Sequence, residues 1–355
     1  MSTSASADPA YGLYCPVPPV DPLGGKVLNE RSFRWFRALG LARGQWLAET
    51  EAACPMDLLA MACPEGVPER MRVVADLWLW EYAFDDHFFD AGEFDGDPTS
   101  AATLLMPHAY LLECPRYATP APGSWEAAML DVRTRMAACG PGTQLDRWSA
   151  IRRDLLLALI FEAAARQRGE YLSLRDTIRL RMDTTGALSY LNMIGFLHGY
   201  ELSAAELAWP ETVAATHACS AVLSLDNDLF SYDREKVVEP SVLMNAVETV
   251  AVHARLPATL AAQRVVELRN RIMRLLVRLT ETLSRSGSAE LAHYAKNMTQ
   301  WVRANLDWSL ATHRYVSYRP DADATFAVHL HLTETAAPSP AADTSTSIWW
   351  WDLID

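Results

Sequence analysis

The sequence is poor in lysine and has no long apolar run. Only three of its 31 basic residues are lysines, and 44 acidic residues give a formal net charge of -13. A surface of this charge repels phosphate backbones and anionic lipid. The longest apolar stretch, 155–161, is far shorter than the roughly 20 residues of a membrane span. We therefore expect no nucleic-acid partner and no membrane partner.

Cysteine pairs and the common catalytic motifs are also missing. The six cysteines include no Cys-x-x-Cys pair, which in a chain of this length favours reduced thiols over a disulfide framework or a zinc site. No Walker loop, Gly-x-Ser-x-Gly sequence or His-x-x-x-His spacing occurs. Residues 1–10 have neither a basic start nor an apolar segment, so we expect a cytoplasmic protein.

Apolar residues at helical spacing run along most of the sequence. Strand-like alternation is nearly absent, and the Pro/Gly/Ser clusters are too short for domain linkers. We predict an all-α fold with one domain at 13–320. A flexible N-terminal tail is expected at 1–12, and a flexible C-terminal tail with a Trp-rich end at 321–355, because of their composition. One run of apolar positions comprises Val73, Leu77, Trp80 and Phe84.

An aromatic, apolar segment ends in the clustered acids Asp85, Asp86 and Asp90. On a helix, Asp86 and Asp90 share a face and Asp85 lies about 100° round. Their like charges repel unless a cation lies between them. A solvent-exposed acidic helix end is the alternative, but four aromatic residues in the preceding two turns favour acids at the rim of a pocket.

A second row of oxygen donors is formed by Asn227, Ser231 and Glu235. Their i, i+4, i+8 spacing places an amide oxygen, a hydroxyl and a carboxylate on one helix face. Hard oxygen ligands of this kind suit Mg²⁺, whose remaining positions commonly go to phosphate and water. A polar stripe facing solvent is the alternative, but the apolar residues at 221–225 favour a buried helix.

Arginines are the candidates for contacts with an anion at such a metal site. Arg234 adjoins Glu235, Arg314 is followed by Tyr315, and Arg181 opens a segment whose Thr-Thr-Gly sequence at 184–186 predicts a helix break. A break leaves free backbone groups that point at a ligand. For any single arginine, a surface salt bridge is the default alternative.

These residues form four motifs, and in them the sequence resembles the bacterial class I terpene cyclases. The acids at 85–90 resemble that family's aspartate-rich motif, and Arg181 resembles its diphosphate-sensing arginine. The row from Asn227 to Glu235 resembles its Asn-Ser-Glu triad, and Arg314-Tyr315 its C-terminal Arg-Tyr pair. Arg181 precedes Asn227 by 46 positions, which also agrees with the family. The resemblance implies a single helical bundle around a central apolar cavity, a small-molecule prenyl diphosphate substrate, and three Mg²⁺ ions.

The resemblance also implies a role for each residue. Asp85 would bridge two ions, whereas Asp86 and Asp90 would act around the metals or during closure. Thr184 and the Thr185 carbonyl would couple diphosphate sensing to ionisation. The implied metal ligands are Asp85, Asp86, Asp90, Asn227, Ser231 and Glu235. The implied diphosphate contacts are Arg181, Arg234, Arg314 and Tyr315, and the implied catalytic residues are Arg181, Thr184, Thr185, Arg314 and Tyr315.

Aromatic residues near these motifs are candidates for the wall of the cavity. Ring faces stabilise a carbocation by about 0.5–2 kcal/mol each, so we expect Phe84, Phe88 and Trp308 to contact the substrate, although such residues are more often plain core. Asn305 lies one turn before Trp308 and is expected to shape the cavity; a surface amide is the alternative.

A narrower similarity concerns the 2-methylisoborneol synthase branch. It is carried by Leu13-Tyr14-Cys15-Pro16, by the Asp-Asp-His-x-x-Asp form of the acid motif, and by Trp209-Pro210-Glu211. It implies 2-methylgeranyl diphosphate or geranyl diphosphate as the substrate and a 2-methylisoborneol-like product. A sesquiterpene cyclase acting on farnesyl diphosphate is the alternative. A homodimer is expected from family habit.

Two other functions find less support in the sequence. Chain-elongating or condensing prenyl enzymes need a second aspartate-rich motif, which this sequence lacks. A noncatalytic helical metal-binding bundle of the di-iron kind needs two Glu-x-x-His pairs, and only the pair from Glu290 to His293 is present.

Overall fold

Helices make up nearly all of the structure, a computed structural model that describes residues 11–41, 44–89, 96–238, 242–318, 330–333 and 350. The all-α prediction is confirmed. The helices are α1 (Gly25–Leu39), α2 (Gln45–Ala52), α3 (Pro55–Ala62), α4 (Pro68–Phe88), α5 (Pro98–Glu113), α6 (Trp125–Cys139), α7 (Gly142–Arg168), α8 (Leu174–Thr184), α9 (Ala187–Leu191), α10 (Ile194–His198), α11 (Ala204–Ala208), α12 (Pro210–Val238), α13 (Ala246–Ala254), α14 (Ala258–Ser286), α15 (Ala289–Ala311) and α16 (His313–Val316), with a 3₁₀ turn η1 (Pro115–Tyr117).

The Pro/Gly/Ser clusters of the sequence coincide with helix ends. Ser124 and Ser288 cap α6 and α15, because their hydroxyls accept hydrogen bonds from the main-chain nitrogens of Ala127 and Leu291. The apolar residues predicted to lie at helical spacing in α4 are buried, and so is a similar run on α14. None of the helices in the described part of the chain combines the length and apolar character needed to cross a bilayer.

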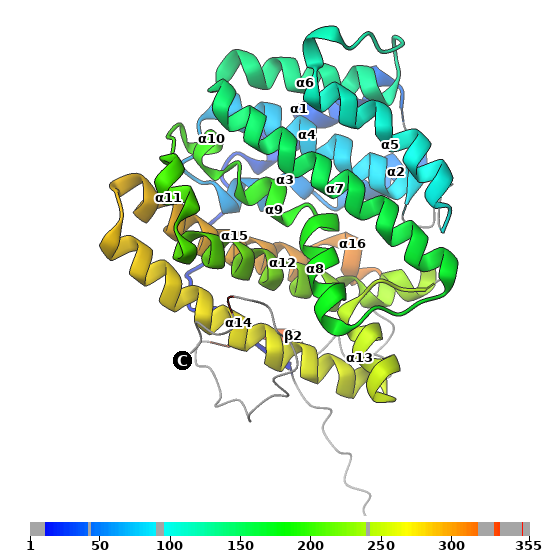
Figure 1. The fold of residues 1–355 in the computed structure, drawn as a ribbon, viewed down its shortest axis with the longest axis vertical. Helices are drawn as coiled ribbons and strands as arrows, with labels where there is room; N and C mark the ends of the chain where they lie inside the picture. The colour runs from blue at the N-terminus through cyan, green and yellow to red at the C-terminus, as the bar shows by residue number, and fades with distance from the viewer. Residues whose placement is uncertain are drawn as a thin grey trace, which may run out of the picture.

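Helix α12 lies at the centre of the bundle, where it packs against α8, α14 and α15 (Figure 1). Helix α4 packs against α1 and α6, and α5 packs against α7. Apolar residues from nearly every helix join one large core. The long helices α4, α7, α12 and α15 therefore surround the interior from different sides.

A small parallel sheet joins the two ends of the described chain. Strand β1 (Tyr11–Tyr14) pairs with β2 (Leu330–Thr333) in the register Tyr11↔Leu330, and β1 packs against α14. The side chain of Asn270 on α14 fixes β1, because it accepts from the Tyr14 nitrogen at 2.8 Å and donates to the Gly12 oxygen at 2.8 Å.

These contacts correct part of the predicted tails. The predicted N-terminal tail includes Tyr11 and Gly12, and the predicted C-terminal tail includes 330–333, yet both segments form strands. Trp350, in the Trp-rich end, is fully buried and belongs to the main core. Composition alone did not reveal pairing between segments more than 300 residues apart. The other tail residues beyond 318 and before 11 lie outside the described part of the chain.

A buried ion pair connects α12 to α14 and to β1. Arg269 donates to both carboxylate oxygens of Asp226, at 2.7 and 3.1 Å, and also contacts the Tyr14 carbonyl oxygen. Both charged side chains are fully buried. Asp226 precedes Asn227 in the chain, so this pair anchors the part of α12 that carries the predicted oxygen-donor row.

We predict that Arg269→Met lowers the free energy of unfolding by about 3–5 kcal/mol, because Asp226 would remain as an unpaired buried carboxylate. Urea denaturation at neutral pH measures the change. Arg37→Met is the matched control: its pair with Glu51 is about half exposed, so the loss should stay below about 1 kcal/mol. Equal losses for the two variants would contradict the anchoring role.

Candidate active site

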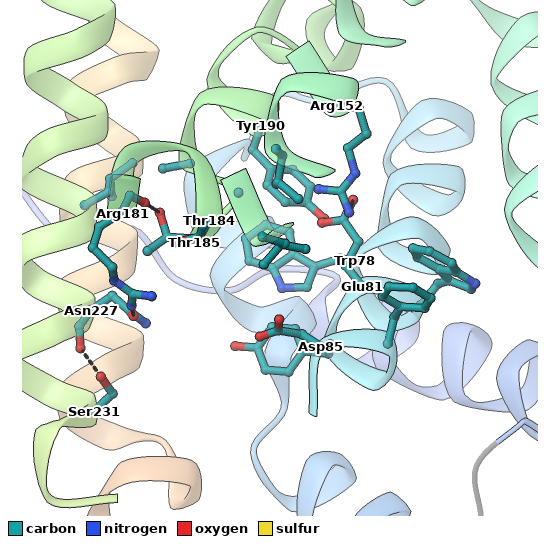
Figure 2. Close-up of a pocket in the computed structure, with 18 of the residues that line it drawn as sticks. Trp78, Glu81, Asp85, Arg152, Arg181, Thr184, Thr185, Tyr190, Asn227 and Ser231 are labelled. Atoms are coloured by element: carbon teal, nitrogen blue, oxygen red, sulfur yellow. Dashed lines mark hydrogen bonds and ion pairs between the residues drawn. The ribbon is translucent and has the colours of Figure 1, made fainter. Parts of the chain in front are cut away.

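A cavity of about 210 Å³ lies inside the bundle, between α4, α7, α12 and α15. Its wall combines aromatic rings with carboxylates and arginines, and Figure 2 shows the side chains from α4 and α12 on opposite sides. A mixed wall of this kind offers one place for an anion and another for an apolar chain. The aromatic residues that line it include Trp78, Trp80, Phe84, Tyr190, Trp301 and Trp308.

The α12 wall carries the predicted oxygen-donor row. Asn227, Ser231 and Glu235 all line the cavity, as expected for residues on one face of a helix. The Ser231 hydroxyl lies 2.7 Å from the main-chain oxygen of Asn227 and contacts the Glu235 carboxylate. Asn245 donates to the other Glu235 oxygen at 2.8 Å. These hydrogen bonds fix the side chains of Ser231 and Glu235 in place.

Asp85 lines the cavity from the α4 side, and Figure 2 shows it across the space from Asn227 and Ser231. Asp86, about 100° further round the helix, faces a different set of partners. It accepts from Arg314 at 2.7 and 3.0 Å, from Arg234 at 3.1 Å and from Trp46 at 2.8 Å. Asp90 lies outside the described residues.

The surroundings of Asp86 change its ionisation. Burial alone would raise its pKa, but the charges and hydrogen bonds of Arg314 and Arg234 outweigh burial and hold the pKa well below the usual range. Burial would likewise lower the pKa of Arg314, and Asp86 raises it instead. Asp86 and Arg314 therefore stay charged, and with Arg234 they link α4, α12 and α16 at one end of the cavity.

Arg181 connects α8 to the α12 row. Its guanidinium donates to Asp228 at 2.8 Å and to the side-chain oxygen of Asn227 at 2.7 Å. Burial opposes the charge of Arg181, whereas Asp228 and Glu235 raise its pKa above the ordinary value. Burial raises the pKa of Asp228 to about 7, with Arg181 acting in the opposite direction. The Asn227 amide nitrogen donates to the Tyr315 hydroxyl at 3.0 Å.

The predicted helix break follows Arg181. Helix α8 ends at Thr184, Gly186 adopts a positive φ of 73°, and α9 then begins. The Thr185 hydroxyl is bound to the Arg181 carbonyl at 2.8 Å, while the Thr184 hydroxyl lines the cavity and is buried without a hydrogen-bond partner. Such a group calls for a ligand or water.

Phe84, Trp308 and Asn305 line the cavity, but Phe88 is not among the lining residues. The Phe88 ring packs 5.0 Å from Phe84 and 5.6 Å from Trp125, between centroids. Helix α4 ends at Phe88, so this residue fills the core beside the acid motif.

The donor set of the cavity fits magnesium. Among the described residues, no three His, Cys, Asp or Glu side chains form a ready metal cluster, because Asp85 stands on one wall and the row on α12 includes an amide and a hydroxyl. All of these donors are hard oxygens, as Mg²⁺ prefers. An anion between the walls would complete the coordination.

Sequence reasoning missed a polar group deeper in the cavity. Glu81, Arg152 and Tyr190 line it together, and Figure 2 shows the Glu81 carboxylate between the other two. One signal for Glu81 was present: it stands four residues before Asp85, on the same face of α4. Arg166 also lines the cavity, and no sequence pattern marked it.

Comparisons with known proteins agree with this geometry. Residues 76–275 match the model of terpene synthase family 2, C-terminal metal binding. The (+)-(1(10)E,4E,6S,7R)-germacradien-6-ol synthase of Streptomyces pratensis is 28% identical over 360 residues, which cover 100% of this chain and 99% of the relative. The 4-epi-cubebol synthase of Streptosporangium roseum, described in its name as (2E,6E)-farnesyl diphosphate cyclizing, is 30% identical over 73% of this chain and 77% of the relative.

A solved structure shares the fold. The crystal structure of 2-methylisoborneol synthase from Streptomyces coelicolor, in complex with Mg²⁺ and 2-fluoroneryl diphosphate, superposes with a TM-score of 0.77 at 19% identity, over 89% of this chain and 99% of that one. The predicted class I terpenoid synthase fold is confirmed. The family match, which spans more than half of the sequence and names a metal-binding region, also supports the use of a divalent metal. The chain therefore belongs to terpene synthase family 2, and it is a terpene cyclase, a carbon–oxygen lyase acting on diphosphates.

Proposed function

We propose that this protein ionises farnesyl diphosphate in the presence of Mg²⁺ and cyclises the resulting cation to a sesquiterpene with release of diphosphate. The observation that carries the proposal is the cavity itself: two walls of oxygen donors face each other beside arginines, and aromatic rings line the rest of the same cavity. The 4-epi-cubebol synthase relative bears farnesyl diphosphate in its name, which supports the C15 substrate.

We propose that the metal sites use both walls. Asp85 would bind on the α4 side, and Asn227, Ser231 and Glu235 on the α12 side, for a total of three ions. When bound, Mg²⁺ neutralises the negative charge that develops on the departing diphosphate. Asp86 already accepts hydrogen bonds from three residues, which favours a role in closure of the site over direct metal binding. For Asp90, the metal-binding role stays a prediction.

The arginines bind the diphosphate in this proposal. Arg181 now donates to Asn227; an incoming diphosphate is a stronger acceptor than an amide oxygen, so it would draw Arg181 away and free Asn227. Because the Thr185 hydroxyl is bound to the Arg181 carbonyl, this movement reaches the break after Thr184. Arg234, Arg314 and the Tyr315 hydroxyl would complete the diphosphate contacts.

The apolar part of the cavity protects the carbocation. Trp78 and Trp301 stack with their planes 9° apart and their centroids 5.7 Å apart, and Trp308 and Phe84 line the same space. Ring faces stabilise positive charge by about 0.5–2 kcal/mol each. A cation formed beside them is shielded from bulk water, which would otherwise capture it before cyclisation.

Shorter substrates are the second candidate. The sequence similarities to the 2-methylisoborneol synthase branch favour 2-methylgeranyl or geranyl diphosphate, but the solved member of that branch is only 19% identical. A cyclase domain at 13–320, a cytoplasmic location and a homodimer stay predictions.

We predict that the purified protein with Mg²⁺ converts farnesyl diphosphate with a kcat/KM at least about tenfold above that for geranyl and 2-methylgeranyl diphosphate, because a C15 chain buries more apolar surface. Diphosphate release and gas chromatography of volatiles measure this. Excess EDTA should stop the reaction, and added Mg²⁺ should restore it. Preference for a C10 or C11 substrate would overturn the proposed C15 substrate. If no diphosphate is released from any of the three substrates, the proposed function is wrong.

Glu235→Gln should raise the Mg²⁺ concentration needed for half-maximal rate by at least about 10–100-fold, because a charged metal ligand is replaced by a neutral one. A Mg²⁺ titration of diphosphate release gives the value. The control is Glu211→Gln, which changes an exposed acid in the first turn of the same helix and should leave the titration unchanged. Overlapping curves for the two variants would remove Glu235 from the metal site.

Asp86→Asn should lower the free energy of unfolding by about 2–4 kcal/mol near neutral pH. Since the folded-state pKa of Asp86 is depressed, its stabilisation is fully present above the unfolded-state pKa of about 4 and disappears as the pH falls through the folded value. Denaturation at several pH values should therefore show that the difference in unfolding free energy between the wild type and Asp86→Asn becomes smaller in acid. The control is Asp131→Asn, at a half-exposed carboxylate, which should lower the free energy of unfolding by less than about 1 kcal/mol at every pH. A loss of stability in Asp86→Asn that does not change with pH would contradict the prediction.

A further inference from the structure

Glu81 introduces a charged group into the apolar part of the cavity. It lies one helical turn before Asp85 on α4, so about 6 Å of helix separates it from the metal-binding end. Trp78 and Tyr190 line the same cavity as Glu81, and their ring centroids lie 4.4 Å apart. None of the proposed steps of metal binding or diphosphate release uses this carboxylate.

Two donors hold Glu81 in place. Arg152 on α7 approaches one carboxylate oxygen at 2.9 Å, and the Tyr190 hydroxyl donates to the other at 2.5 Å. The side chains of Glu81 and Arg152 are only 12% and 6% exposed. The pKa of Glu81 is raised, because burial outweighs the opposing effects of Arg152 and Tyr190. The oxygen that faces Arg152 is buried and accepts no hydrogen bond, and the other keeps a second lone pair, so both can accept a hydrogen bond from water.

One N–H group of Arg152 makes no hydrogen bond. Its Nε is buried and has no hydrogen-bond partner, although the guanidinium is paired with Glu81 through another nitrogen. A buried N–H without a partner costs about 1–3 kcal/mol. A water molecule that accepts from such a donor and donates to a neighbouring carboxylate satisfies both groups, and buried waters commonly occupy sites of this kind.

We propose that Glu81 and Arg152 hold the water molecule that ends the reaction, so that the product is a terpene alcohol. A lone pair of the water oxygen forms the new C–O bond to the cationic carbon. One O–H bond of that water breaks, its electron pair stays on oxygen, and the proton passes to the Glu81 carboxylate, which later returns it to solvent. Tyr190 is a positioning residue that fixes the carboxylate. This inference rests on the proposed cyclisation.

The test uses the full-length enzyme with farnesyl diphosphate and Mg²⁺ in water enriched in ¹⁸O. The wild type should release an alcohol that carries ¹⁸O. Glu81→Gln should release diphosphate at a rate within about threefold of the wild type, while the ratio of alcohol to hydrocarbon falls by about 100-fold, the usual effect of losing a general base. Arg152→Lys, which keeps the charge but removes Nε, should lower this ratio by about tenfold.

Asp76→Asn is the matched control. Asp76 is a buried acid on the same helix, held by Arg135 at 2.5 Å and the Ser32 hydroxyl at 2.8 Å, and it does not line the cavity. Its loss should reduce stability and leave the product ratio unchanged. If Glu81→Gln does not fold, Arg152→Lys and the wild-type product still decide the question.

Three results would overturn the inference: a wild-type product without water-derived oxygen, an unchanged alcohol share in Glu81→Gln or in Arg152→Lys, or the same shift in Asp76→Asn. Normal diphosphate release accompanies each of these results. A wild type that releases no diphosphate from any allylic substrate instead defeats the proposed function, and the inference with it.

Discussion

Buried carboxylates need a cation beside them, and this constraint organises the interior of the protein. Asp226 is paired with Arg269, Asp228 with Arg181, Asp86 with Arg314 and Glu81 with Arg152. Removing either member of such a pair leaves a charge that the interior cannot solvate. The planar guanidinium can donate to two acceptors at once, which fits a sequence in which only three of 31 basic residues are lysines.

The same pairing prepares the site for an anion. Before substrate binds, Arg181 is shared between Asp228 and Asn227, and Arg314 is bound to Asp86. In the proposed reaction a diphosphate would compete for these donors, so binding would redistribute existing hydrogen bonds and the arginines need not be brought in from solvent. The helices α4, α8, α12 and α16 are linked through these few side chains, so a change in one hydrogen bond alters the contacts between the helices.

Local sequence patterns predicted the parts of the site that one helix can specify. The spacing of Asn227, Ser231 and Glu235 places them together because helix geometry alone fixes their common face. The break after Thr184 followed from the low helix propensity of two threonines and a glycine. Both predictions needed no knowledge of neighbouring helices.

Features that depend on tertiary packing were not predictable in the same way. Whether Asp85 or Asp86 faces the cavity depends on where Trp46 and Arg314 lie, and both are distant in sequence. The spacing of Glu81 from Asp85 hints at a place on the cavity face of α4, but its partners Arg152 and Tyr190 are 71 and 109 positions away in the sequence. The pairing of β1 with β2 likewise joins opposite ends of the chain.

A carboxylate beside a carbocation raises a chemical problem, because the oxygen could attack the cation and trap it as an ester. The Tyr190 hydroxyl donates to one Glu81 oxygen, and the Arg152 guanidinium lies 2.9 Å from the other; both contacts lower the availability of the carboxylate electrons. A water molecule between the carboxylate and the cation is neutral and smaller, and it gains nucleophilicity only as its proton moves to Glu81. The ion pair with Arg152 also cancels most of the charge of Glu81, so the aromatic faces remain the main stabilisers of the cation until water adds to it.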